Sequence, residues 1–218
     1  MNKTKIVIAG GGFAGLTAAT YLDKRLAGRE HIEVVLISRE NFILFTPMLH
    51  EVAAGDLSPS DIVNPLRRIL RHVKIVQADV NAIDPSKRCV RCSGGVAQLD
   101  FDIEFDHLLL AVGSETNFFD LPGLSDWAVT MKNLSDAALL RNRVIALLEE
   151  ANLQEDLAIR RQLLTFVIAG AGFSGVETAG AINDFVREAA AYYPDLSEEL
   201  ARVVLVHPGQ FVLPELGK

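Results

Sequence analysis

The residues of this sequence best suited to chemistry are two sets of glycines. The pattern G-x-G-x-x-G occurs twice, 160 residues apart, at Gly10, Gly12 and Gly15 and again at Gly170, Gly172 and Gly175. In this pattern the first glycine makes a tight turn, the second lets the backbone approach a pyrophosphate, and the third lets a helix pack closely on its strand. Phosphates then lie at the helix N-terminus, where free N–H groups and the helix dipole favour negative charge. The two sets of glycines therefore predict dinucleotide binding.

Both glycine patterns lie in the same sequence context. Residues 5–20 read KIVIAGGGFAGLTAAT and residues 165–180 read TFVIAGAGFSGVETAG, with 8 of 16 positions identical. Each is a short β-branched run, then glycines, then a helix of small residues, which is how a βαβ unit begins. One such turn is weak evidence, because glycines often join a strand to a helix. Two in matching context indicate two related domains in tandem, since the period is too long for a solenoid.

The elements that must position these turns give an α/β fold class. We expect two Rossmann-like dinucleotide-binding domains with parallel sheets, the first with an inserted β-hairpin and the second truncated. The expected division is a first nucleotide domain over residues 1–117, a linker and helix over 118–160, and an incomplete second nucleotide domain over 161–218. A complete second domain needs at least one more strand and helix. In the incomplete domain, the last strand would lack a neighbour, which would favour a homodimer, strand exchange or a mobile edge.

The pattern of apolar residues predicts individual elements in each domain. For the first, we expect helices over 14–26, 48–54 and 60–71, strands over 32–38 and 73–84, a strand pair over 87–106 turning at 93–95, and a buried strand over 107–112. The long helix would begin at Ser60 and expose Arg67, Arg68 and Arg71. For the second, we expect helices over 134–152 and 173–190 and strands over 163–169 and 202–207.

The strand ends that follow each glycine turn lack the acid that usually binds a ribose hydroxyl. Ser38 stands at this position in the first unit and His207 in the second. Serine can still bond the ribose, and Arg39 could cover the adenine or reach a phosphate. A solvated strand end explains Ser38 equally well and His207 somewhat better. The sequence leaves the choice between NADH and NADPH open.

Composition and charge narrow the function classes. Half the residues are hydrophobic, and 21 basic against 28 acidic residues give a net charge of −7, which argues against nucleic-acid binding. Neither a signal peptide nor an apolar run of membrane-spanning length is present. A reducing, cytoplasmic setting is expected, with peripheral attachment to the inner face of the cell membrane left open.

Several further motifs give the sequence a family likeness. It resembles type II NADH dehydrogenases in the run Gly10–Gly15, the loop 41–49 (NFILFTPML), the run 55–59 (GDLSP), the run 111–114 (AVGS) and the run 172–177 (GFSGVE). These are FAD enzymes that pass electrons from NADH to a membrane quinone. The resemblance implies FAD at the first turn, around Phe13 and Ala14, and NAD(P)H at the second, around Phe173 and Ser174. It also implies Val80 near the adenine, Ala111 and Gly113 near the pyrophosphate, and Thr46 and Pro47 near the isoalloxazine ring.

Three ionisable residues are candidates for a direct role at the flavin: Glu177, His50 and Glu51. By resemblance Glu177 faces the nicotinamide–flavin stack and handles protons, and a carboxylate favoured by a helix N-terminus is an equal alternative. His50 and Glu51 could line the flavin or quinone side, although a solvated or packed helix face is the favoured interpretation. No metal site is expected.

Cys89 and Cys92 form a C-x-x-C pair. On a strand, residues three apart point to opposite faces, and no second Cys/His pair lies nearby, so a structural role is favoured. Disulfide reductases of this architecture carry their redox pair just after the second strand. Residues 40–47 contain no cysteine, which excludes a dithiol reductase.

The expected function is hydride transfer from NADH to FAD followed by electron transfer to a quinone. The alternatives are an enzyme similar to sulfide:quinone oxidoreductases, which needs cysteines close to the flavin, and a non-catalytic nucleotide-binding fragment. Residues 1–218 alone are expected to be inactive, because the later segments of the family are absent from them.

Overall fold

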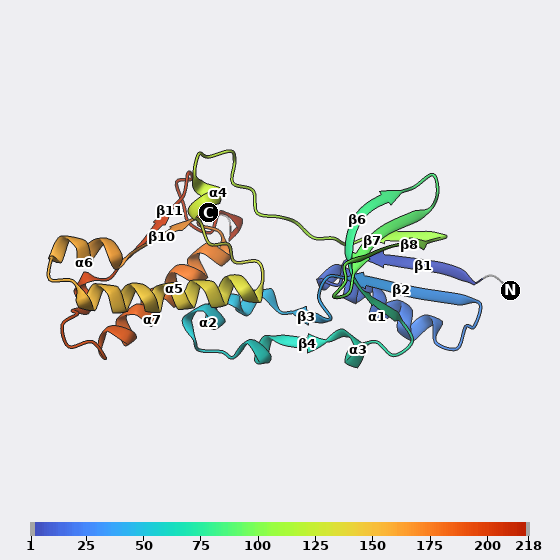
Figure 1. The fold of residues 1–218 in the computed structure, drawn as a ribbon, viewed down its shortest axis with the longest axis horizontal. Coiled ribbons are helices and arrows are strands. Elements are labelled where there is room, and N and C mark those ends of the chain that lie inside the picture. Colours follow the sequence, from blue (N-terminus) through green and yellow to red (C-terminus); the bar gives the residue numbers. More distant parts are fainter. Residues whose placement is uncertain (1–2, 217–218) are drawn as a thin grey trace. The chain divides into compact units, whose positions relative to one another are not determined.

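A computed structural model describes residues 3–216, which form two compact units (Figure 1). Unit 1 contains the residues up to Leu44 together with Val63–Glu115, and unit 2 contains Phe45–Ile62 and the residues from Thr116 onward. This partition differs from the linear division expected above, because Phe45–Ile62 carries a helix that packs against two helices of the second half. Which nucleotide each domain binds stays a prediction.

The centre of unit 1 is a four-stranded parallel sheet in the order β5-β2-β1-β9. Its strands are β1 (Thr4–Ala9), β2 (Ile32–Ser38), β5 (Lys74–Gln77) and β9 (His107–Leu110). Helix α1 (Phe13–Leu26) connects β1 to β2, as the first βαβ unit requires. The predicted α/β class with parallel sheets is confirmed.

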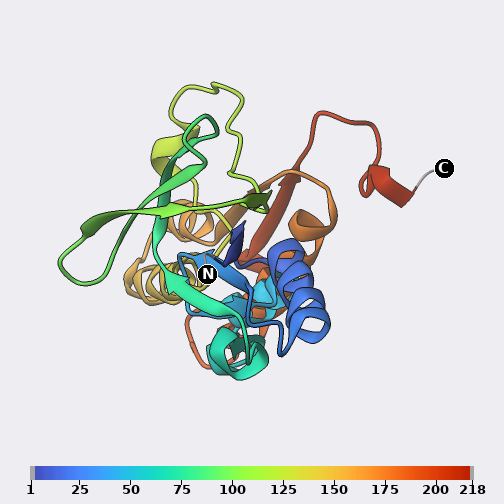
Figure 2. The same ribbon diagram turned by 90° about the vertical axis from the view of Figure 1, so that its right-hand side faces the viewer.

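Alternating side chains of β1 and β2 build two cores on opposite faces of this sheet. Ile8 and Leu36 point to one face, where they pack with Ala19 of α1 and with Leu66 and Leu70. Val7, Val35 and Ile37 point to the other face, where they pack with Ala78, Val90 and Cys92 of the antiparallel strands. Figure 2 shows α1 in blue and these green strands on opposite sides of the parallel strands. Two-sided burial explains why both strands read as continuous apolar runs.

The expected helix from Ser60 to Arg71 is wrong. The structure has a 3-10 turn at Pro59–Ile62, strand β4 (Val63–Pro65) and a single helical turn α3 (Leu66–Ile69). Pro65 disfavours a helical Asn64, and β4 instead pairs antiparallel with β3 (Phe42–Leu44). The three arginines are exposed as expected, and the Arg67 guanidinium donates to the Ile75 carbonyl at 3.2 Å.

Two other strand predictions need correction. Residues 73–84 form two strands, because β5 ends at Gln77 and β6 (Asp79–Asp84) joins a separate antiparallel sheet with β7 (Cys89–Gly94) and β8 (Leu99–Glu104). The expected strand pair is present, but its turn spans residues 95–98. β9 is not buried, since Leu110 is 59% exposed and β1 is its only pairing partner within residues 3–216.

Unit 2 is built on the second βαβ unit. Strands β10 (Thr165–Ala169) and β11 (Arg202–Val206) pair in parallel, and α7 (Phe173–Ala190) connects them. The remaining helices are α2 (Leu49–Ala54), α4 (Leu124–Trp127), α5 (Leu134–Leu153) and α6 (Leu157–Leu163), of which α4 and α6 were not predicted.

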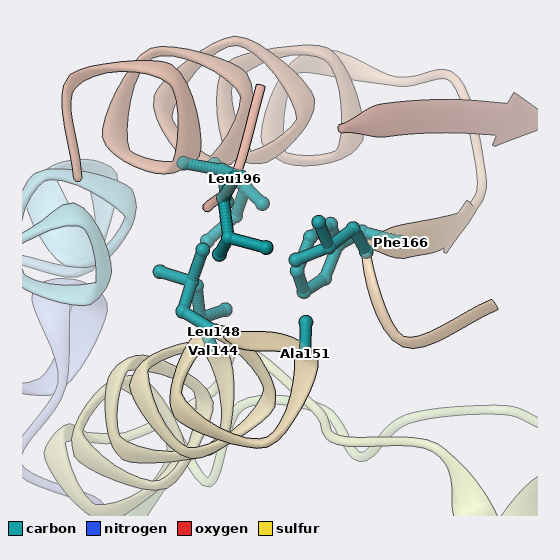
Figure 3. Packing of buried hydrophobic residues seen from close by; sticks show 8 residues of the cluster. Val144, Leu148, Ala151, Phe166 and Leu196 are labelled. Carbon is teal, nitrogen blue, oxygen red and sulfur yellow. The ribbon is translucent and has the colours of Figure 1, made fainter. Parts of the chain in front are cut away.

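The core of unit 2 joins α5, β10 and α7. Val144, Leu148 and Ala151 of α5 face Phe166 of β10 and Leu196, as the close-up shows (Figure 3). Asn133 caps α5 by accepting from the Asp136 N–H at 2.9 Å, which explains why the helix begins at Leu134. This packing holds β10, and with it the second glycine turn, in place.

Among the described residues, no helix combines the length and the apolar character needed to cross a bilayer.

Candidate functional site

The first glycine turn has the geometry that the sequence predicted. Gly10 has φ +109°, and its N–H donates to the Ile37 carbonyl at 2.8 Å. A Cβ at Gly10 would overlap the Ala111 carbonyl, and one at Gly15 would overlap the Gly10 carbonyl. A Cβ at Gly12, by contrast, would meet nothing within 4 Å. The turn is therefore tightly packed at Gly10 and Gly15, whereas the space next to Gly12 is open, where a pyrophosphate would approach.

The second turn repeats this arrangement. Gly170 also has φ +109°, its N–H donates to the Val206 carbonyl at 2.8 Å, and a Cβ at Gly175 would overlap the Gly170 carbonyl. Gly12 and Gly172 are the N-caps of α1 and α7 and offer no side-chain cap. Neither helix carries an acidic residue in its first turn, so both N-termini retain the positive end of the dipole.

The residues at or just after the ends of β2 and β11 lie in different environments. Ser38 is 6% exposed, and a Cβ at Gly11 would overlap its hydroxyl, which makes Gly11 a packing glycine that the pattern alone did not identify. Arg39 donates from Nε to Asp79 Oδ1 at 2.7 Å, so its guanidinium is held beside β6. His207 is half-buried at the end of β11.

Of the remaining residues predicted for unit 1, Ala111 lies against the first glycine turn, and Gly113 follows two residues later. Ala111 donates to the Ala9 carbonyl at 2.8 Å, and Gly113 has φ +77° with open space above its Cα. Val80 is half-buried against the core shared with β7. Phe13 is 50% exposed at the first turn of α1, and Phe173 is 48% exposed at the matching position of α7.

The most informative geometry in unit 2 is a small cavity of about 20 Å³, large enough for one water molecule. It brings together residues from three distant parts of the chain. Its polar and flanking side chains include Thr46, Pro47, His50, Met131, Ser174 and Glu177. The residues predicted to lie near the isoalloxazine ring thus share a cavity with those predicted at the nicotinamide.

His50, which lines this cavity, lies close to two carboxylates. His50 Nδ1 lies 3.7 Å from Glu177 Oε2, and His50 Nε2 lies 3.3 Å from Glu51 Oε1. The imidazole is 16% exposed, whereas the Glu51 and Glu177 side chains are 36% and 43% exposed. The favoured interpretation of His50 as part of a packed or solvated helix face agrees with its place on α2, and the structure adds that its imidazole lies near Glu177.

Three cavity residues were not predicted as site residues: Leu49, Met131 and Thr178. Thr178 is 7% exposed and lies four residues after Ser174, so helical spacing from Ser174 and Glu177 could have identified it. Met131 comes from the irregular segment before α5, and no local signal in the sequence relates it to α7.

The two cysteines lie on opposite faces of β7. Cys92 is buried in the core and Cys89 is partly exposed, and both are free thiols. Burial, reinforced by the charges of Cys89 and Asp102, raises the pKa of Cys92 to about 11. Burial and Asp102 also raise the pKa of Cys89. Thiols held protonated at neutral pH are poor nucleophiles and ligands. Within residues 3–216 no cluster of three or more His, Cys, Asp or Glu side chains could hold a metal ion.

Comparisons with known proteins agree with this geometry. Residues 4–218 match the pyridine nucleotide-disulphide oxidoreductase family, and the chain belongs to it. The chain is 35% identical to the type II NADH:quinone oxidoreductase NdhA of Mycobacterium tuberculosis, over 99% of this chain and 45% of that protein. It is 33% identical to the mitochondrial external alternative NAD(P)H-ubiquinone oxidoreductase B4 of Arabidopsis thaliana, over 100% of this chain and 38% of that protein.

A solved structure extends the likeness to the fold. NDH2 from Plasmodium falciparum in complex with NADH matches with a TM-score of 0.87 and 25% identity, over 98% of this chain and 44% of that one. The chain thus spans less than half the length of the relatives it matches.

Proposed function

We propose that the protein containing this chain transfers a hydride from NADH to FAD and passes the electrons on to a quinone. FAD would bind at the first glycine turn, and NADH would bind at the second. The observation that carries the proposal is the cavity of unit 2, in which Thr46 and Pro47 lie with Ser174 and Glu177. Hydride transfer needs the nicotinamide against the flavin, and these two pairs come from the segments assigned to each ring.

The residues present fit both dinucleotides. Each turn offers a helix N-terminus without a side-chain cap and without an acid in the first turn, which suits a pyrophosphate. Above Gly12 there is open space where any side chain would obstruct the phosphates. Gly113, with φ +77°, gives a second close approach of the backbone on the same side of unit 1.

The chain's own residues would bind the two cofactors, orient their rings and shield them from water. When bound, FAD would supply the chemistry of accepting a hydride and releasing electrons singly or in pairs. Thr46 and Pro47 would set the position of the flavin ring, with Pro47 fixing the backbone at the start of a 3-10 turn. Ser174 and Glu177 would border the nicotinamide, and Glu177 would exchange protons with the site. None of these side chains needs to be a nucleophile.

NADH is the preferred nucleotide in this proposal. The preference rests on the resemblance to type II NADH dehydrogenases, because His207 follows β11 and neither an acid nor an arginine cluster after Val206 decides between the two nucleotides. One relative is named for NADH and another for NAD(P)H, so the choice is testable. Competition between NADH and NADPH in steady-state kinetics decides it, and a lower KM for NADPH would reverse the assignment.

A quinone acceptor implies contact with a membrane surface. We propose peripheral association with the inner face of the cell membrane. We also propose a homodimer, because the described part of β11 pairs only with β10 and leaves an edge for a further strand. Flotation with lipid vesicles and sedimentation of the complete protein test these two proposals separately.

Anaerobic stopped-flow absorbance of the complete protein tests the central proposal. NADH should bleach the flavin, and a soluble ubiquinone analogue should restore the absorbance. Bleaching by sulfide but not by NADH would favour a sulfide:quinone oxidoreductase. A protein that holds no flavin, or whose flavin responds to neither donor, would be a non-catalytic nucleotide-binding module.

A further inference from the structure

We propose that His50 is a positioning residue, which holds the Glu177 carboxylate at the cavity and exchanges a proton between it and Glu51. The proposal rests on the function proposed above. It adds a residue that the glycine patterns do not identify, and it concerns the step that consumes a proton from solvent.

The geometry places one imidazole between two carboxylates. Nδ1 faces Glu177 Oε2 at 3.7 Å, and Nε2 faces Glu51 Oε1 at 3.3 Å. His50 and Glu51 come from α2, while Glu177 comes from α7, and these two helices pack against each other within unit 2. The imidazole is 16% exposed, so solvent reaches it less than it reaches either carboxylate.

This arrangement offers a path for a proton for a simple chemical reason. A neutral imidazole has one N–H donor and one acceptor nitrogen, whereas a carboxylate can only accept. Between two carboxylates, a neutral imidazole can donate to one of them, and a protonated imidazole can donate to both. A proton can shift from one end of the set to the other while the side chains stay in place.

The surroundings keep the set at the cavity. α5 also packs against α2, and Asp136 at its start is already occupied by the Thr130 hydroxyl at 2.7 Å and the Lys132 N–H at 2.8 Å. The cavity beside Glu177 has room for one water, which could carry a proton onward. Glu51 is 36% exposed and so connects the set with solvent.

The proposed reaction needs this proton. NADH, one proton and a quinone give NAD⁺ and a quinol, so the hydride supplies both electrons and one hydrogen, and solvent supplies the second hydrogen. Reduction of the flavin by hydride transfer does not depend on the solvent proton. If His50 exchanges protons with Glu177, its loss should therefore slow the reduction of quinone and leave the reduction of the flavin unchanged.

The test separates the two half-reactions in the complete FAD-loaded protein by anaerobic stopped flow. His50→Gln keeps a polar side chain that can bond Glu177 but cannot carry a proton. We expect flavin reduction by NADH to change by less than about twofold, while reoxidation by a soluble quinone slows by about 10²-fold. Glu51→Gln should slow the same step less. His72→Gln is the matched control, because His72 also pairs with a carboxylate, Asp23 Oδ1 at 3.3 Å, but is 62% exposed and lies in unit 1.

Two further measurements exclude a purely structural effect. In His50→Ala, added imidazole should restore the quinone step, whereas pyrrole, which has the same shape but cannot accept a proton, should not. The changes in the thermal midpoint of the complete protein caused by His50→Gln, Glu177→Gln and both should be non-additive, which would report the contact without any measurement of activity.

The outcomes distinguish this proposal from the function on which it rests. Equal slowing of both half-reactions in His50→Gln, unchanged reoxidation, or rescue by pyrrole would each overturn the role of His50. A wild-type protein whose flavin NADH does not reduce would overturn the proposed function itself.

Discussion

The two glycine turns have the same backbone conformation, but the first glycine of each turn has different neighbouring atoms. Gly10 and Gly170 share φ +109°, and each donates its N–H to the end of the neighbouring parallel strand. A Cβ at Gly10 would overlap the carbonyl of Ala111, the residue directly after β9, whereas a Cβ at Gly170 would meet nothing within 4 Å. The backbone motif is thus set by local sequence, while its tolerance to change is set by the strands around it.

The largest expected effect contrasts these two glycines. Gly10→Ala combines a left-handed backbone with an overlap against Ala111 and should lower the free energy of unfolding by about 4 kcal/mol. Gly170→Ala carries only the backbone strain and should cost about 2 kcal/mol. Urea denaturation followed by circular dichroism gives both values.

Gly180→Ala provides the matched control. Gly180 lies inside α7, and a Cβ there would meet nothing within 4 Å. The substitution should stabilise the protein by about 0.5–1 kcal/mol. Equal losses for Gly10→Ala and Gly170→Ala would mean that the closure by Ala111 has no energetic consequence.

The next prediction compares the cores of the two units. Leu36 packs under α1 in unit 1, and Leu148 packs between α5 and α7 in unit 2, and both are fully buried. Each change to alanine should cost about 3 kcal/mol. If the units unfold separately, Leu36→Ala shifts one thermal transition and Leu148→Ala shifts the other, as differential scanning calorimetry would resolve. A single transition moved equally by both would show one cooperative unit.

Elements that depend on local interactions could be predicted from the sequence, whereas elements that depend on contacts between distant residues could not. β2 and α7 have the predicted bounds because their apolar patterns and glycines are local. The helix at 60–71 fails because Pro65 and the pairing of β4 with β3 override helical periodicity. The strand at 73–84 divides because Ala78 donates to the Ser38 carbonyl, a contact about 40 residues away.

The same reasoning applies to the candidate site. The glycines, Ser38 and the Thr46–Pro47 run could be read from spacing and resemblance. The contact of His50 with Glu177 could not, because it depends on α2 packing against a helix more than a hundred residues later. Met131 is similar, since only the fold brings its irregular segment to the cavity.

A third prediction tests the open side of the first turn. A Cβ at Gly12 has free space, and its φ of −75° and ψ of −166° are an extended backbone that does not require glycine. Gly12→Val should therefore change the free energy of unfolding by less than about 1 kcal/mol. Its side chain would occupy the place of the FAD pyrophosphate and weaken binding by about 10²-fold, or roughly 2.7 kcal/mol. Flavin absorbance per mole of purified complete protein measures the loss, and a normal flavin content would remove the assignment of FAD to this turn.

The smallest expected effect concerns the two faces of β7. Cys92 is 0% exposed, and burial raises the pKa of its thiol to about 11, so at pH 7.5 almost no reactive thiolate forms. Cys89 is partly exposed, and burial also raises its pKa. Iodoacetamide should therefore label Cys89 slowly in the native protein and Cys92 at least about tenfold more slowly, at a rate that follows opening of the antiparallel sheet. Peptide mass spectrometry over time measures both rates, and urea below the unfolding midpoint should speed up Cys92 more than Cys89. Raising the pH should speed up Cys89 directly, because its thiolate gains population while the residue stays accessible. Equal labelling of the two thiols in the native state would mean that β7 does not separate them, and the structural role assigned to Cys92 would then be wrong.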